Sequence, residues 1–150
     1  MSERAKELDT LKRKLTRKMM KAVRAYDLIA PGDRIMVGVS GGKDSYTLLD
    51  LLSAVRRRSP FEFSIVAVHL DQGQPGYDGR ALEAWLNEYG CEFEIVRQDT
   101  YSIVLELTKP GGTFCAPCSR LRRGILYSTC LLYTSPSPRD RTRSRMPSSA

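Results

Sequence analysis

Apolar residues recur along this chain with two periods, which alternate from one segment to the next. Short apolar runs within residues 35–39, 64–70 and 91–96 are typical of strands, and the first is β-branched like a strand covered by helices. Apolar positions three or four residues apart predict helices around and between these runs. The predicted helices lie within residues 7–26, 48–55, 81–89, 99–109 and 120–127.

Strand, helix, strand, helix, strand in this order predicts right-handed βαβ crossovers and a parallel sheet. We therefore expect an α/β fold with a Rossmann-like parallel sheet and helices on both of its faces. A basic N-terminal helix should occupy residues 1–30, and the α/β domain should occupy residues 31–130. Gly90 is placed to cap the helix that ends at Tyr89.

The first predicted helix is amphipathic. Its apolar stripe consists of Leu8, Leu11, Leu15, Met19, Ala22 and Tyr26. Much of the remaining surface is filled by Lys12, Arg13, Lys14, Arg17, Lys18, Lys21 and Arg24. Either these cations are solvated while the stripe packs on the domain, or they bind RNA phosphates in a salt-dependent way. The sequence leaves both interpretations open.

Length and composition narrow the class of protein. A chain of 150 residues is sufficient for one domain with a buried core. The apolar runs are too short to cross a membrane and the N-terminus lacks a signal peptide, so we expect a cytoplasmic protein with no membrane contact. The net charge of +7 arises at the two ends, since residues 25–130 contain eleven basic and thirteen acidic residues. This asymmetry suits contact with nucleic acid.

The strand at 35–39 is followed by Ser40-Gly41-Gly42-Lys43-Asp44-Ser45 and then by a helix. Glycines permit a sharp turn, and the bare amides at a helix N-terminus favour a bulky anion. The whole string therefore predicts a phosphate site rather than an ordinary loop with two glycines. It is not a Walker loop, because Gly-x-x-x-x-Gly-Lys-Ser/Thr is absent.

The strand at 64–70 ends at His69-Leu70-Asp71-Gln72. Ligands of open parallel sheets sit at the carboxyl ends of strands, so Asp71 is a candidate to line a nucleotide pocket. His69 is the only histidine of the chain, and at a strand end we expect a structural rather than a catalytic role for it.

Cys115 and Cys118 form a Cys-x-x-Cys pair. Such a pair can direct both sulfurs to one metal or cluster, exchange a disulfide, or remain two idle thiols. It supplies only two of the ligands that a zinc or iron–sulfur site usually needs. Arg120, Arg122 and Arg123 follow, and these side chains could stabilise thiolates or meet a phosphate backbone.

The string at 40–45 resembles the pyrophosphate loop of the N-type ATP pyrophosphatases, whose signature is Ser-Gly-Gly-x-Asp-Ser. Together with residues 32–37, 70–76 and 115–127, it is similar to the tRNA 2-thiocytidine synthases, which are ATP-dependent tRNA-cytidine 2-sulfurtransferases of the bacterial cytoplasm. The resemblance extends from the first helix to about Ser128. It implies the adenine nucleotide alpha hydrolase-like version of the Rossmann-like fold.

The resemblance also implies a specific chemistry. The residues it implies for binding ATP with Mg²⁺ are Ser40, Gly41, Gly42, Lys43, Asp44, Ser45 and Asp71. The C2 oxygen of a cytidine in the tRNA anticodon loop would attack the α-phosphate and release pyrophosphate, and sulfur from a cysteine desulfurase would then displace AMP.

Three residues are the catalytic candidates by the same resemblance, namely Asp44, Cys115 and Cys118. In this family three cysteines hold a [4Fe–4S] cluster, and Cys115 and Cys118 match the first two metal ligands. The resemblance further implies a homodimer for the full-length family.

The chain departs from the family near its C-terminus. Chains of the family are longer, and their further part carries the third cluster cysteine, which has no match here; Cys130 lies at the junction and is not assigned as a ligand. Residues 131–150 have the composition of a disordered segment and look like translated vector sequence, the alternative being a basic tail that binds RNA. We expect an N-terminal fragment that binds ATP, holds a cluster poorly and is inactive alone.

Two other classes of protein remain open. One is another tRNA-modifying enzyme with this loop, either a thiouridylase or a lysidine synthetase; the Cys-x-x-Cys pair favours thiolation over lysidine formation. The other is a non-catalytic module that binds metal or RNA.

Overall fold

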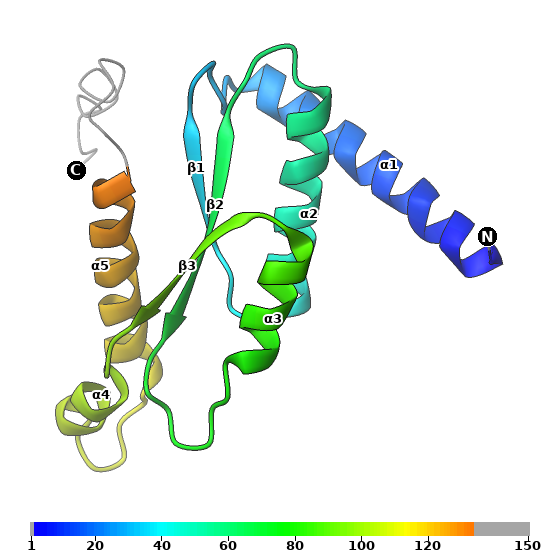
Figure 1. The fold of residues 1–150 in the computed structure, drawn as a ribbon. Helices are drawn as coiled ribbons and strands as arrows, with labels where there is room; N and C mark the ends of the chain where they lie inside the picture. Colours follow the sequence, from blue (N-terminus) through cyan, green and yellow to red (C-terminus); the bar gives the residue numbers. More distant parts are fainter. Residues whose placement is uncertain (1, 134–150) are drawn as a thin grey trace.

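The computed structural model describes residues 2–133, which form five helices and three strands (Figure 1). The strands are β1 (Arg34–Gly38), β2 (Ser64–Asp71) and β3 (Glu92–Arg97). The helices are α1 (Glu3–Ala25), α2 (Lys43–Arg58), α3 (Arg80–Tyr89), α4 (Tyr101–Leu107) and α5 (Cys115–Tyr133). Every element predicted from the apolar pattern is present, with ends displaced by a few residues.

The three strands form one parallel sheet in the order β1-β2-β3. Arg34 pairs with Ser64 at the start of β1, and Val66 pairs with Glu92 at the start of β3. The central strand is buried from Ile65 to His69. A strand enclosed on both faces has no solvated side, which explains its nearly continuous apolar run.

Helices cover both faces of the sheet, with α2 and α3 on one side and α5 on the other (Figure 1). The main core lies between the sheet and the first of these layers. Its buried residues are Ile29, Val37, Val39, Leu49, Leu52, Val55, Phe63, Ile65, Ala67, Leu82 and Leu86. The α/β fold with a Rossmann-like parallel sheet is thereby confirmed. Gly90 caps α3 in the left-handed conformation (φ 73°), as predicted.

The helix α5 continues to Tyr133, whereas the composition predicts disorder from residue 131. Tyr133 provides a physical reason for this difference. The Arg34 guanidinium lies 4.8 Å from the centre of the Tyr133 ring, and the Tyr133 hydroxyl donates a hydrogen bond to the Glu94 carboxylate. The last turn of α5 is therefore tied to both edge strands. The rest of the segment predicted to be disordered, residues 134–150, lies outside the described residues.

The second half of α1 packs on the core of the domain, and Lys12 in the first half forms an ion pair with Asp50 of α2. Met19, Met20 and Val23 contact the core, whereas Leu8 and Leu11 are 59% and 49% exposed. The apolar stripe was thus predicted correctly only in part: Leu8 and Leu11 lie on the projecting end of the helix, and Tyr26, at the C-cap, is 75% exposed. A helix of 23 residues is about 35 Å long, and its N-terminal half projects beyond the α2 layer (Figure 1).

No helix within residues 2–133 combines the length and the apolar character that a bilayer crossing requires.

We predict that Leu86→Ala lowers the free energy of unfolding by about 2–5 kcal/mol, because this fully buried side chain would leave a cavity in the core. Urea denaturation followed by circular dichroism measures the change. Leu8→Ala is the matched control, and its effect should stay within about 0.5 kcal/mol because Leu8 is largely exposed. Equal losses in the two variants would contradict the placement of the core and of α1.

Candidate functional site

The hydroxyl of one serine, Ser45, connects the two ends of the loop between β1 and α2 through hydrogen bonds. The Ser45 hydroxyl donates a hydrogen bond to the Gly42 carbonyl at 2.8 Å and accepts one from the Ser40 amide at 3.3 Å. Gly41 has a φ of 83°, a left-handed conformation that side chains with a Cβ rarely adopt. These contacts give the predicted phosphate loop a defined shape.

The loop presents the positive end of α2. Gly42 is the N-cap of this helix and makes no side-chain capping bond, so the first-turn amides are not covered by a cap. The side chains of Lys43 and Asp44 are 89% and 91% exposed, and they form an ion pair of 2.6 Å between Lys43 Nζ and Asp44 Oδ1. An exposed pair contributes little, so Lys43 can exchange this partner for an incoming anion. A helix N-terminus without a side-chain cap, together with the exposed Lys43 cation, suits a phosphate.

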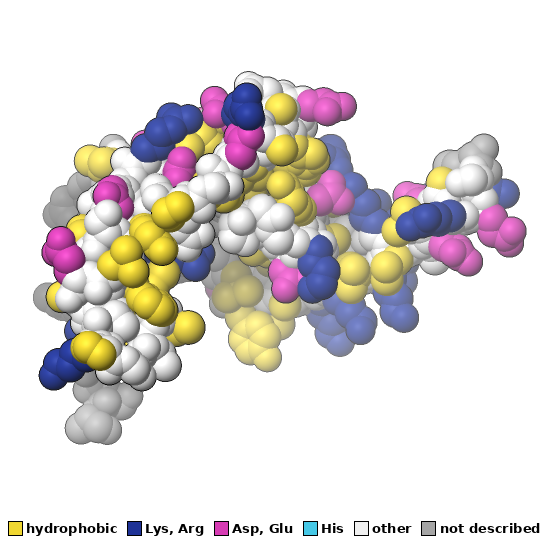
Figure 2. Space-filling model, turned by 90° about the horizontal axis from the view of Figure 1, so that it is seen from below, with side chains coloured by type: hydrophobic (Ala, Val, Ile, Leu, Met, Phe, Trp, Pro, Cys, Tyr) yellow, Lys and Arg dark blue, Asp and Glu magenta, His cyan; other side chains and the backbone are white. Residues whose placement is uncertain are grey.

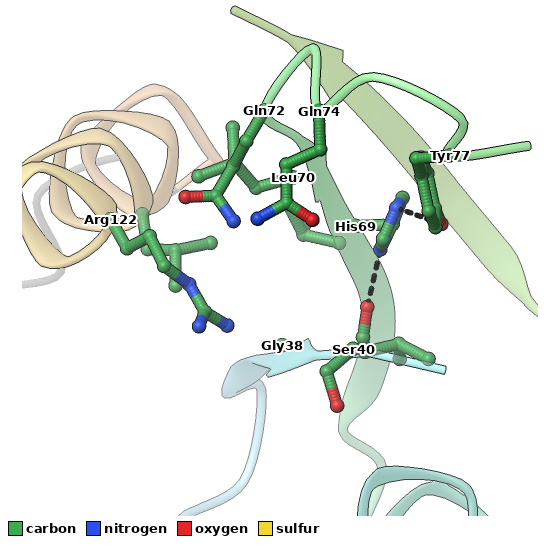
Figure 3. A pocket seen from close by; sticks show the side chains of 11 residues that line it. Gly38, Ser40, His69, Leu70, Gln72, Gln74, Tyr77 and Arg122 are labelled. Carbon is green, nitrogen blue, oxygen red and sulfur yellow. Dashed lines mark hydrogen bonds between the residues drawn. The ribbon is translucent and has the colours of Figure 1, made fainter. Parts of the chain in front are cut away.

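A cavity of about 320 Å³ opens beside this loop, at the carboxyl ends of β1 and β2 (Figure 3). Open parallel sheets bind their ligands at this position. The polar residues of its lining are Ser40, His69, Gln72, Gln74, Tyr77 and Arg122. The cavity therefore adjoins the phosphate loop at Ser40 and has both hydrogen-bond donors and an aromatic ring in its walls.

His69 lies beneath the cavity and is 5% exposed. Its Nδ1 is 2.7 Å from the Val39 carbonyl oxygen, and its Nε2 is 2.8 Å from the Tyr77 hydroxyl. Burial raises the pKa of Tyr77, and the charge of nearby Asp71 raises it further, so this hydroxyl keeps its proton. The expected structural role of His69 agrees with these two bonds.

Gln72 connects the cavity to the Cys-x-x-Cys pair. Its Oε1 accepts hydrogen bonds from the Thr100 hydroxyl and from the Cys118 thiol, both at 3.2 Å. Thr100 is 1% exposed and stands directly before α4. The side chain of Gln72 is thus held from two elements at the rim of the cavity, with the Cys118 sulfur next to it.

One face of α5 is directed at the cavity. Cys118, Arg122 and Leu126 are four residues apart and lie on one side of the helix, and the last two line the cavity (Figure 3). Arg120 and Arg123 do not line it. The sequence offered all three arginines as a group; the four-residue spacing from Cys118 is the signal that separates Arg122 from the other two.

The cysteine pair occupies the first turn of α5, with Cys115 exposed and Cys118 half-buried. Cys130 is twelve residues beyond Cys118 in the same helix, which places it about 18 Å from Cys118 along the axis. Cys91 is at the start of β3, and burial raises the pKa of its thiol. Among residues 2–133 no group of three or more His, Cys, Asp or Glu side chains is arranged to hold a metal. The described residues therefore do not form a complete three-cysteine site.

Asp71 is the last residue of β2, and its carboxylate accepts a hydrogen bond from the Gly73 amide at 3.0 Å. It is not part of the cavity lining. Of the predicted site residues, Ser40 lines the cavity and Cys118 is hydrogen-bonded to Gln72 at its rim, while Asp71 shapes the loop that carries Gln72 and Tyr77. Asp44 is exposed on the outer side of the phosphate loop.

Comparison with known protein families gives one match of direct relevance. Residues 10–98 match the PP-loop domain. This segment contains α1 from Thr10 onward, the loop at 40–45 and all three strands.

In curated relatives, about half of the aligned residues are identical to those of this chain. A tRNA-cytidine(32) 2-sulfurtransferase of Anaeromyxobacter sp. (strain K) is 50% identical over 125 residues, which are 83% of this chain and 43% of that protein. The enzyme of the same name from Bordetella petrii is 52% identical over 121 residues, which are 81% of this chain and 37% of that protein. The chain thus spans less than half the length of these relatives, and the resemblance inferred from its motifs is confirmed.

A solved structure shows the same architecture. The U34-tRNA thiolase NcsA from Methanococcus maripaludis, determined with its [4Fe-4S] cluster, has a TM-score of 0.63 and 27% identity; the match covers 80% of this chain and 41% of that protein. Because the PP-loop match covers more than half of the chain, and the fold and the loop agree with it, the chain belongs to the PP-loop family.

Proposed function

We propose that this chain is the nucleotide-binding part of a tRNA sulfurtransferase that converts a cytidine of the anticodon loop to 2-thiocytidine. The observation that carries the proposal is a single cavity beside which a phosphate loop, a cation and a cysteine sulfur lie. Ser40 brings the phosphate loop to it, Arg122 adds a cation, and Gln72 ties the Cys118 sulfur to its rim. Identities of 50% and 52% to tRNA-cytidine(32) 2-sulfurtransferases support the same activity.

The C2 oxygen of cytidine is a poor leaving group, so the reaction must first convert it into a better one. The C2 oxygen of cytidine would attack the α-phosphate of ATP, and pyrophosphate would leave with the electron pair of the broken P–O bond. A sulfur nucleophile would then add at C2, and the original oxygen would depart with AMP. The chain's own contribution is to hold the phosphates in line and to stabilise the charge that develops on them.

The residues divide this work by position. The amides of the 40–45 loop and Lys43 would bind the β- and γ-phosphates, with Mg²⁺ accompanying ATP and Asp44 near the metal. Arg122 faces the loop across the cavity and would bind the α-phosphate oxygens, where charge develops in the transition state. Asp71 would act through the shape of the loop after β2.

Sulfur chemistry is the part for which the described residues are incomplete. Cys115 and Cys118 would provide two of three ligands for a [4Fe–4S] cluster, and the third cysteine of the family has no match in this chain. A cysteine desulfurase as the sulfur donor, a homodimer and a cytoplasmic location remain predictions from the resemblance. Because the relatives are more than twice as long as the matched segment, we expect ATP binding without turnover from this chain alone.

A second candidate is thiolation of uridine. It is favoured by the structural similarity to a U34-tRNA thiolase, at 27% identity. Cytidine is the better substrate proposal, since the cytidine-specific relatives are about twice as similar in sequence. Mass spectrometry of tRNA from a strain that carries the full-length gene distinguishes 2-thiocytidine from 2-thiouridine.

The tRNA would contact the free face of α1. Lys14, Arg17, Lys18, Lys21 and Arg24 follow one another at helical spacing and are exposed. They lie on the side opposite Thr16, which is buried against α2, and opposite Lys12, which pairs with Asp50 at 2.7 Å. Figure 2 shows Lys and Arg side chains gathered along the projecting helix. We call these five residues the basic face of α1.

We predict that Arg122→Ala weakens the binding of MgATP about tenfold, because one charge-assisted contact to a phosphate is lost. Isothermal titration calorimetry of the 150-residue chain measures the dissociation constant. Arg120→Ala, on the same helix but outside the cavity lining, is the matched control and should leave binding within about twofold of the wild type. Equal effects of the two substitutions would contradict the orientation of α5.

We predict that the triple variant Lys14→Gln, Lys18→Gln, Lys21→Gln weakens binding of an anticodon stem–loop RNA and flattens its salt dependence. The slope of log K against log salt should fall in magnitude by about 2–3, since three phosphate contacts would be lost. The measurement is filter binding at several salt concentrations.

The control for this experiment replaces the same three lysines with arginine, which keeps the charge and should keep the slope. A glutamine variant with an unchanged slope would show that the basic face of α1 is only solvated.

A further inference from the structure

We propose that Tyr77 forms the wall against which the base of the bound nucleotide lies, and that His69 is a positioning residue that holds both this wall and the entrance of the phosphate loop. The inference rests on the proposed binding of ATP in the cavity. It concerns two residues to which neither the PP-loop match nor the sequence motifs assign a role in binding.

The hydrogen bonds of His69 determine its tautomer. The Val39 carbonyl can only accept, so the Nδ1 that lies 2.7 Å away must carry the hydrogen. The other ring nitrogen, Nε2, is then an acceptor, and it receives the Tyr77 hydroxyl at 2.8 Å. Both nitrogens of this buried ring are therefore satisfied, and each is bound to a different side of the cavity.

The first of these bonds fixes the entrance of the phosphate loop. Val39 is 2% exposed and stands directly before Ser40. Its amide donates to the Val68 carbonyl at 2.8 Å, while its carbonyl accepts from His69. Both hydrogen-bonding groups of Val39 are thus held by the end of β2, so the loop leaves the sheet in one direction.

The second bond fixes the aromatic ring. Tyr77 is 42% exposed and lines the cavity, and its ring centre lies 5.7 Å from that of His69. In Figure 3, Tyr77 and Arg122 stand on opposite sides of the cavity, and Ser40 lies between them.

This arrangement suits a ligand with phosphates at one end and a flat base at the other. The loop and Arg122 provide for the anionic end, whereas Tyr77 offers the more exposed of the two aromatic rings in the cavity lining, since the His69 ring is buried. Stacking on an aromatic ring is tolerant of base identity and depends on the ring being held in place. His69 supplies that hold through the tyrosine hydroxyl.

Calorimetry with two ligands, MgATP and magnesium tripolyphosphate, tests the proposal on the 150-residue chain. Tripolyphosphate has the phosphates without the base. We expect the wild type to prefer ATP, and Tyr77→Ala to lose about tenfold in ATP affinity while tripolyphosphate binding is unchanged. Tyr77→Phe keeps the ring but releases it from His69, so it should lose roughly threefold for ATP alone.

His69→Ala should weaken both ligands, and ATP more than tripolyphosphate, because the loop entrance is released together with Tyr77. Tyr26→Phe, at a tyrosine that is 75% exposed at the end of α1, is the matched control and should bind as the wild type does. The ratio of the two affinities separates positioning from loss of stability, since a variant that merely unfolds weakens both ligands equally.

An unchanged ratio in Tyr77→Ala would overturn the proposal while leaving the phosphate site intact. A wild type that binds tripolyphosphate as tightly as ATP would also overturn it. A wild type that binds neither ligand would overturn the proposed function together with this inference.

Discussion

The parallel pairing of β1 with β2 determines where the phosphate loop and the segment from His69 to Tyr77 lie. The pairing continues one residue beyond β1, where the Val39 amide donates to the Val68 carbonyl at 2.8 Å. It therefore delivers the loop at 40–45 and the segment from His69 to Tyr77 to the same edge of the sheet. The buried side chains of β2 and the α2–α3 layer maintain this register, because a shift by one residue would reverse the faces of the strand.

The cavity at this edge lies between candidate functional residues that are far apart in the sequence. The proposed phosphate-binding loop leads into α2, the Arg122 cation and the Cys118 sulfur come from α5, and the Tyr77 ring comes from the loop after β2. Gln72 and His69 are the connecting residues, since each is bound to two different elements. Such a site depends on the packing of α5 against the sheet, to which Arg34, Glu94 and Tyr133 contribute.

What could be predicted from the sequence is what depends on local spacing. The strand, the glycines and the helix around residues 40–45 are contiguous, so the phosphate loop was predictable, as was the glycine cap of α3. The choice of Arg122 over its neighbours depends on how α5 is rotated against the sheet. The His69–Tyr77 bond depends on a loop conformation, and the exposure of Leu8 depends on how far α1 extends past α2. Apolar periodicity contains none of these three-dimensional relations.

The proposed binding of ATP phosphates depends on the shape of the loop at 40–45, which Ser45 closes. The most direct measurement compares the MgATP dissociation constants of Ser45→Ala and Ser53→Ala by calorimetry. Both serines belong to α2 and both hydroxyls donate to a backbone carbonyl at 2.8 Å, but Ser53 bonds Leu49 away from the loop. We predict a roughly fivefold to tenfold loss of affinity for Ser45→Ala and a change within about twofold for Ser53→Ala. Equal affinities for the two variants would contradict the assignment of the phosphate site.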